Sequence, residues 1–251
     1  MEYLRGLRRL REDPTWTSKI GIGSVLFLST MVIPLLGQVA LQGWTALILR
    51  RAVAGQETPL PRLDLDLDYL GKLLGPGFKA FIASFVWALP VAFLVGGSVA
   101  CLYIGFIVAA MNMRGAPDEL GLGVLLGLAI GFPLLMIVAI LLSLPAQVAA
   151  IRAEISDDMN QGFRFGAVLS MTRLVWKELL VGSIVLALVQ QVFTFGSLLL
   201  CGLPLIPSMV ALMVARAHFG AQLYARYLER GGEPLPVGPL ELGAPVSRPA
   251  F

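Results

Sequence analysis

The side chains that most often perform catalysis or bind metals are scarce in this chain. It has one histidine, His218, and two cysteines, Cys101 and Cys201, which both lie within apolar stretches. A metal site needs several such ligands, and a hydrolytic triad needs a histidine beside its nucleophile. Ser183 and Ser208 have no base near them in the sequence, and no glycine-rich phosphate loop occurs. We therefore expect no enzyme activity, no metal and no cofactor.

Amide side chains within long apolar stretches are the other residues suited to chemistry. A solute pathway through a membrane needs polar groups inside the helix bundle. The same amides also join transmembrane helices by hydrogen bonds, so both interpretations stay open. The amides are Gln38, Gln42, Asn112, Gln147, Gln190 and Gln191.

The elements that carry these amides are uncharged apolar runs. No Asp, Glu, Lys or Arg occurs in residues 80–113 or in residues 120–151. A helix of about 20 apolar residues crosses a hydrocarbon core of roughly 30 Å. The composition agrees, because 57% of the residues are hydrophobic and only 14% are charged, whereas soluble domains have about a quarter charged residues. We predict a transmembrane hairpin here, with its polar break at residues 114–119.

Two further uncharged runs extend this pattern. Residues 179–215 are long enough for two crossings, with a turn near 196–204. Residues 20–49 are interrupted by Pro34 and Gly37, so they form a tight hairpin, one bent helix or a re-entrant loop. The prediction is an all-α fold: a polytopic transmembrane helix bundle of about six membrane segments in three hairpins, with amphipathic interfacial helices.

The polar segments divide the chain into three parts. Residues 1–19 form a basic cytoplasmic segment that begins with an amphipathic helix on an anionic lipid surface. Residues 20–230 form the transmembrane helical domain, and residues 231–251 a proline-rich tail that is disordered or extended. We also expect a short interfacial helix at residues 63–70 and an amphipathic helix at residues 163–175.

The placement of Lys and Arg predicts the topology in the cytoplasmic (inner) membrane. The N-terminal segment, residues 50–79, residues 152–177 and the segment after Ala215 are rich in these residues, which favours the cytoplasmic side for each. Both termini are therefore expected to be cytoplasmic and residues 114–119 outside. The residues expected at the membrane interface, near anionic headgroups, are Arg164, Arg173, Lys177, Arg216 and His218.

Two short segments share the spacing from an arginine to a Pro-Leu-Pro sequence, residues 51–61 and residues 226–236. Each follows a broken apolar run. The match indicates either an internal duplication, which is frequent in transporters, or a helix-exit signal used twice.

Three stretches carry a resemblance to a known family: residues 43–61, residues 163–179 and residues 217–224. With the hydropathy profile, they resemble the bacterial and archaeal membrane proteins of domain-of-unknown-function family 4013. The resemblance implies a multi-spanning membrane protein with no established activity and no catalytic residues to assign.

Two functions are consistent with these features. The first is a non-catalytic integral membrane protein, a scaffold or accessory subunit, whose partners are membrane lipids and other membrane proteins or further copies of itself. The alternative is a small transporter or channel with a polar pathway between broken helices. A net charge of +3 gives no indication of nucleic-acid binding. Convergence of the amides on one water-accessible cavity would distinguish the two functions.

Overall fold

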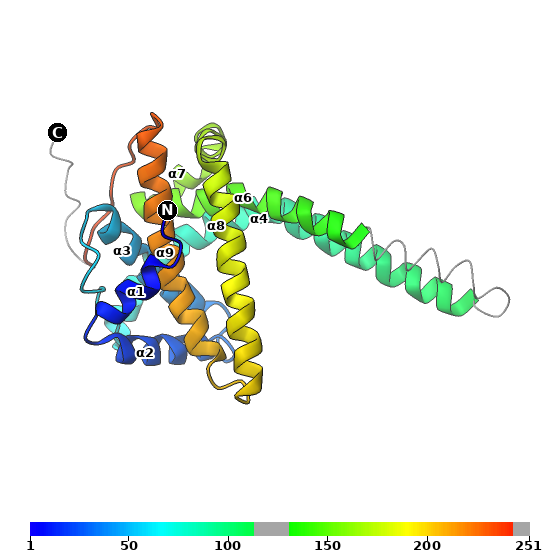
Figure 1. Ribbon diagram of the computed structural model, residues 1–251, viewed down its shortest axis with the longest axis horizontal. Coiled ribbons are helices and arrows are strands. Elements are labelled where there is room, and N and C mark those ends of the chain that lie inside the picture. Colours follow the sequence, from blue (N-terminus) through cyan, green and yellow to red (C-terminus); the bar gives the residue numbers. More distant parts are fainter. Residues whose placement is uncertain (113–130, 243–251) are drawn as a thin grey trace.

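The computed structural model describes residues 1–112 and 131–242, and these residues are helices and their connections, with no β-strand (Figure 1). The helices are α1 (Arg5–Glu12), α2 (Trp16–Ser29), α3 (Leu36–Val53), α4 (Leu67–Asn112), α6 (Phe132–Ser156), α7 (Met159–Phe163), α8 (Phe165–Leu199) and α9 (Leu205–Glu229).

Three helical segments are long and apolar enough to cross a membrane: Leu67–Gly105 of α4, Pro133–Ser156 of α6 and Phe165–Leu199, which is α8. Helix α6 packs beside α4, and the pair projects from the body of the protein, crosswise to α8 (Figure 1). Large apolar side chains on the projecting pair are exposed, as helices in lipid require. The polar break expected at residues 114–119 lies outside the described residues.

Residues 20–49 belong to two helices that pack against each other, so a single bent helix is excluded. Helix α2 has 14 residues and α3 has 18. At 1.5 Å per residue they reach only about 21 and 27 Å, short of a bilayer core of about 30 Å. The connection between them is apolar and exposed, with Met31 81% and Val32 82% accessible. By contrast, α3 is buried along most of its length and lies at the centre of the body.

Helices α3 and α4 touch through their backbones. A Cβ atom on Gly77 would lie 1.9 Å from the Val39 carbonyl oxygen, and one on Gly43 would lie 2.0 Å from the Leu73 carbonyl oxygen. Small residues allow membrane helices to approach this closely. The crossing fixes the first part of α4 against the central helix α3.

The segment before α4 differs from the predicted interfacial helix. Residues 63–66 are not helical, and the helix begins at Leu67 and continues as α4. The helix prediction for residues 63–66 is therefore wrong. The physical reason is burial of this segment, because Leu60 and Leu63 are buried and Trp44 Nε1 donates a hydrogen bond of 3.2 Å to the Pro61 carbonyl.

Asp13 joins the α1–α2 connection to this same segment. Its carboxylate accepts hydrogen bonds of 2.8 Å from Lys19 Nζ and from the Leu60 N–H, and of 2.7 Å from Thr15 Oγ1. Burial alone raises the pKa of Asp13, but these donors outweigh it and lower the pKa from 3.8 to about 2. The buried carboxylate therefore stays charged and ties three segments together.

The C-terminal residues 232–242 lie outside any helix and pack on the protein, so the disordered alternative does not describe this part of the tail. The Leu235 side chain is buried, and its N–H donates a 2.7 Å hydrogen bond to the Tyr224 hydroxyl. The Gly238 N–H donates to the Ile155 carbonyl at 2.7 Å. Partners on α6 and α9 therefore fix this part of the tail, and residues 243–251 lie outside the described residues.

The amphipathic helix expected at residues 163–175 is the first part of α8. That helix begins at Phe165 and continues to Leu199 through non-helical dihedral angles at Val175 (φ −120°, ψ 17°). Val168 and Met171 are buried against the body, while Leu169 and Arg173 are exposed.

Candidate solute cavity

A cavity of about 640 Å³ lies between α3, α4, α6, α8 and α9. This volume falls within the range of about 300–1,000 Å³ that small-molecule sites occupy. Its wall combines aromatic and aliphatic side chains with polar ones. The polar residues that line it are Gln38, Gln42, Thr45, Ser84, Ser143, Gln147, Glu154, Ser183 and Arg216.

The spacing of these residues along α3 and α6 explains why they meet. On α3, Gln38, Gln42 and Thr45 follow one another at steps of four and three residues. On α6, Gln147 lies four residues after Ser143 and seven before Glu154. Residues at such steps lie on one face of a helix. Each helix therefore presents a polar stripe to the cavity and apolar residues elsewhere.

Side-chain hydrogen bonds join the helices around the cavity. Ser183 Oγ on α8 donates to Gln147 Oε1 on α6 at 3.0 Å. Arg216 Nη2 on α9 donates to Gln190 Oε1 on α8 at 2.9 Å. In the described part of the chain, no carboxylate lies within 4.0 Å of the Arg216 guanidinium. Arg216 is exposed and lines the cavity, so its guanidinium is accessible to a bound molecule.

A buried arginine lies against the backbone of Glu154. Arg50 is 1% exposed, and its Nε donates to the backbone carbonyl of Glu154 at 2.5 Å. Its Nη2 pairs with Asp157 Oδ1 at 3.0 Å, and its Nη1 donates to the Pro239 carbonyl at 3.3 Å. Lys79 Nζ reaches Asp157 Oδ2 at 3.1 Å. These contacts hold α3, α4, α6 and the tail together and occupy the Arg50 guanidinium.

The Glu154 side chain consequently has no ion-pair partner within 4.0 Å among the described residues. The amide of Gln42 lines the same cavity. The cavity therefore contains one carboxyl group and one guanidinium, supplied by different helices. Neither forms an ion pair among the described residues, so both can contact a bound molecule.

The cavity lies within the part of the chain that matches a protein-family model. The family model described as "Protein of unknown function (DUF4013)" matches residues 26–220. The chain belongs to the DUF4013 family. Every residue that lines the cavity falls within the matched range, whereas α1 and the packed tail lie outside it. No curated protein and no solved structure matches this DUF4013 chain.

The structure brings together three of the six amides singled out by the sequence. Gln38, Gln42 and Gln147 line the cavity of the DUF4013 domain, and Gln190 holds Arg216 at its edge. Gln191 is exposed on α8 and does not line the cavity. Asn112 is the last residue of α4, and its side chain lies outside the described part of the structure.

The residues expected at the membrane interface have different environments. Arg164 directly precedes α8, and Arg173 and Lys177 lie on it; all three are exposed. Arg216 lines the cavity, as described above. His218 is only 2% exposed, so it does not face headgroups as expected.

Helix α1 explains the burial of His218, because it covers this part of α9. The Tyr3 and Phe219 rings lie 6.0 Å apart, and a Cβ on Gly6 would meet Ala215 Cα at 2.6 Å. Leu10 is buried within the protein. The amphipathic N-terminal helix therefore packs on α9, which differs from the expected lipid-facing position.

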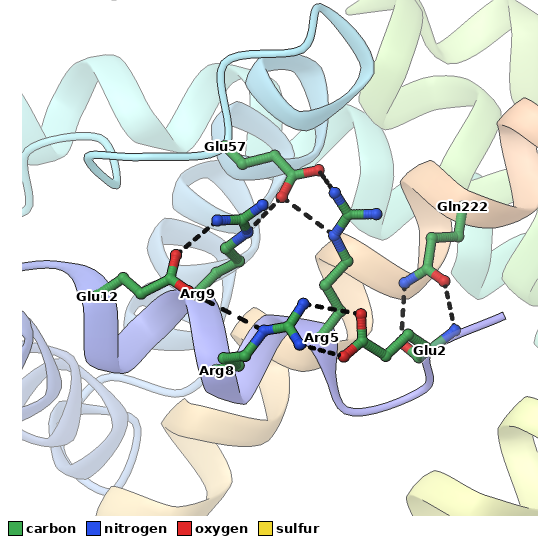
Figure 2. Close-up of polar contacts among 7 residues, drawn as sticks. All are labelled: Glu2, Arg5, Arg8, Arg9, Glu12, Glu57 and Gln222. Atoms are coloured by element: carbon green, nitrogen blue, oxygen red, sulfur yellow. Dashed lines mark hydrogen bonds and ion pairs between the residues drawn. The ribbon is translucent and has the colours of Figure 1, made fainter.

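Three of the four arginines of α1, Arg5, Arg8 and Arg9, are paired within the protein (Figure 2). Arg9 Nε and Arg5 Nη2 each lie 2.6 Å from the Glu57 carboxylate, and Arg8 Nη1 lies 2.7 Å from Glu2 Oε1. These ion pairs join α1 to the connection that follows α3. Arg5, Arg8 and Arg9 therefore pair with carboxylates, whereas the sequence predicts that this basic segment contacts lipid headgroups.

Glu154 lines the cavity, but the sequence alone did not single it out. The uncharged run ends at Ile151, so Glu154 was placed in the Lys/Arg-rich segment 152–177. The signal was nevertheless present, because Glu154 continues the face of Ser143 and Gln147 on a helix that ends only at Ser156.

Proposed function

We propose that this DUF4013 protein binds a small polar solute in the cavity and serves as a small transporter or channel. The observation that supports this is the convergence of Gln38, Gln42 and Gln147 with Glu154 and Arg216 on one cavity. Ionisable groups in membrane helices are costly and generally mark substrate pathways. A purely structural bundle needs amides to join helices, but it does not need two unpaired opposite charges around a shared space. The proposal involves no catalytic step.

We further propose six membrane segments in three hairpins within the inner membrane. Helices α4, α6, α8 and α9 cross the bilayer, and the short α2–α3 pair enters it as a re-entrant hairpin. Both termini lie in the cytoplasm. Ion pairs support this topology, because they link the Lys/Arg-rich segments: Arg9 to Glu57, Lys79 to Asp157 and Arg230 to Glu178.

A scaffold remains the second candidate, on the strength of one feature. The projecting α4–α6 pair exposes Phe93, Tyr103 and Leu134, with 76%, 66% and 61% of their surfaces accessible. Such a surface fits lipid, other membrane proteins or a second copy of the chain. Under this function the cavity would have no aqueous access.

Cysteine accessibility tests the proposal directly. In a background with Cys101→Ser and Cys201→Ser, we would place one cysteine in the cavity, Ala150→Cys, and one on the exposed face of α8, Leu188→Cys. Membrane vesicles of both orientations are treated with a charged, membrane-impermeant thiol reagent. We expect Ala150→Cys to react and the lipid-facing Leu188→Cys to stay unmodified. Failure of Ala150→Cys to react from either side would favour the scaffold.

The topology has its own test in the same background. Gly115→Cys is expected to react only from the periplasmic side and Gly231→Cys only from the cytoplasmic side. Modification of both positions from one side would contradict the three-hairpin arrangement.

A further inference from the structure

We infer that the cavity recognises a small zwitterion, with its cationic end at Glu154 and its anionic end at Arg216. This inference rests on the proposed binding of a solute in the cavity. It names the chemical class of that solute. Soluble peptides and the phosphatidylethanolamine headgroup both have this chemistry.

The first argument is the origin of the two charges. Glu154 comes from the last turns of α6 and Arg216 from the middle of α9, and both line the same cavity. They form no ion pair with each other. By contrast, Arg50 and Lys79 pair with Asp157, and Arg230 pairs with Glu178.

The second argument is the consequence of binding a singly charged solute. An anion bound at Arg216 would place a second negative charge in the cavity, beside that of Glu154. A cation bound at Glu154 would place a second positive charge there, beside that of Arg216. A charged side chain gains free energy from an oppositely charged partner at hydrogen-bond distance. A zwitterion gives each side chain a partner and adds no net charge to the cavity. Arginine binds carboxylate and phosphate groups particularly well, because its planar guanidinium donates two parallel hydrogen bonds.

The third argument is the composition of the rest of the cavity wall. Phe81, Phe85 and Leu186 line the cavity together with Gln147 and Ser183. Apolar surface of this kind accommodates hydrocarbon, and the amide and hydroxyl groups offer hydrogen bonds to a peptide group. A dipeptide with aliphatic side chains therefore fits the chemistry of the wall, and its size suits a cavity of about 640 Å³.

The test uses the full-length protein in phosphatidylglycerol nanodiscs and three matched probes: L-leucyl-L-leucine, its N-acetyl derivative and its C-terminal amide. The derivatives remove the cationic and the anionic end, respectively. We expect calorimetric titration to give the highest affinity for the free dipeptide, and affinities about tenfold lower or weaker for both derivatives, because each loses one charge-assisted hydrogen bond.

Two substitutions make the assignment of the ends specific. Glu154→Gln should shift the preference to the N-acetyl derivative, and Arg216→Gln should shift it to the amide. Glu154→Asp and Arg216→Lys retain the charges and should keep the preference for the free dipeptide, which controls for misfolding. Equal affinities for the three probes in the wild-type protein, or the same shift in both neutral variants, would overturn the inference.

A lipid arm separates the two sources of the zwitterion. If phosphatidylethanolamine in the nanodisc lowers dipeptide affinity, and does so only when Glu154 and Arg216 are both present, the occupant is a lipid headgroup and the charge assignment stands. If neither dipeptide nor lipid binds while Ala150→Cys reacts with the aqueous reagent, the solute cavity stands and the zwitterion inference fails. An unreactive Ala150→Cys would instead refute the proposed function.

Discussion

Replacement of Gly77 by alanine tests the contact between α3 and α4. The added Cβ would lie 1.9 Å from the Val39 carbonyl oxygen and 2.8 Å from the Gly43 nitrogen. Ordinary contacts begin near 3.4 Å, so α4 would have to move away from α3 by about 1.5 Å. Overpacking of this kind costs about 1–3 kcal/mol or more. The higher helix propensity of alanine returns only about 1 kcal/mol.

The expected result is a lower unfolding temperature for Gly77→Ala, by several degrees, in thermal unfolding of the protein in nanodiscs. Gly71→Ala is the matched control, because it makes the same chemical change six residues earlier on α4, where no atom lies within 4 Å of the added Cβ. The control should unfold at the wild-type temperature or slightly above it. An unfolding temperature for Gly77→Ala equal to that of Gly71→Ala would refute the backbone contact between the two helices.

Three other perturbations have expected outcomes. Because hydrogen bonds lower the pKa of Asp13 from 3.8 to about 2, its stabilisation is complete above about pH 5 and is lost as the pH falls through 2. Asp13→Asn should therefore lower the unfolding temperature at pH 7 and have little effect near pH 2. Truncation after Gly232 should lower the unfolding temperature because it removes the residues packed on α6 and α9, whereas truncation after Leu242 should not. Leu223→Asp places a charge in the core and should abolish accumulation of folded protein on size-exclusion chromatography, while His218→Gln should leave membrane insertion unchanged.

The sequence predicted the long apolar helices because their signal is local. Residues 80–113 lack charge whatever their neighbours are, and α4 includes nearly all of them. Gln38 and Gln42 were singled out as amides within an uncharged run, which is an equally local signal, and both line the cavity. These features need no knowledge of tertiary contacts.

The features that the sequence did not predict depend on distant partners. Leu10 and His218 are buried because α1 packs on α9. No sequence pattern near either residue indicates that contact. Leu235 is packed only because the Tyr224 hydroxyl accepts its N–H. Hydropathy treats basic and proline-rich segments as solvated, so it cannot identify those that ion pairs and backbone hydrogen bonds fix to the protein.

The docking of α1 on α9 has a consequence for biosynthesis. The Glu2 N–H donates to Gln222 Oε1 across 220 residues of sequence, so the ribosome makes one partner long before the other. Domains generally fold from the N-terminus during synthesis, but this helix lacks the surface on which it packs until α9 has been made. The earlier helices are therefore made while α1 is still undocked from α9. Association of α1 with α9 is one of the last steps of assembly, and only a chain whose synthesis has passed Gln222 can complete it.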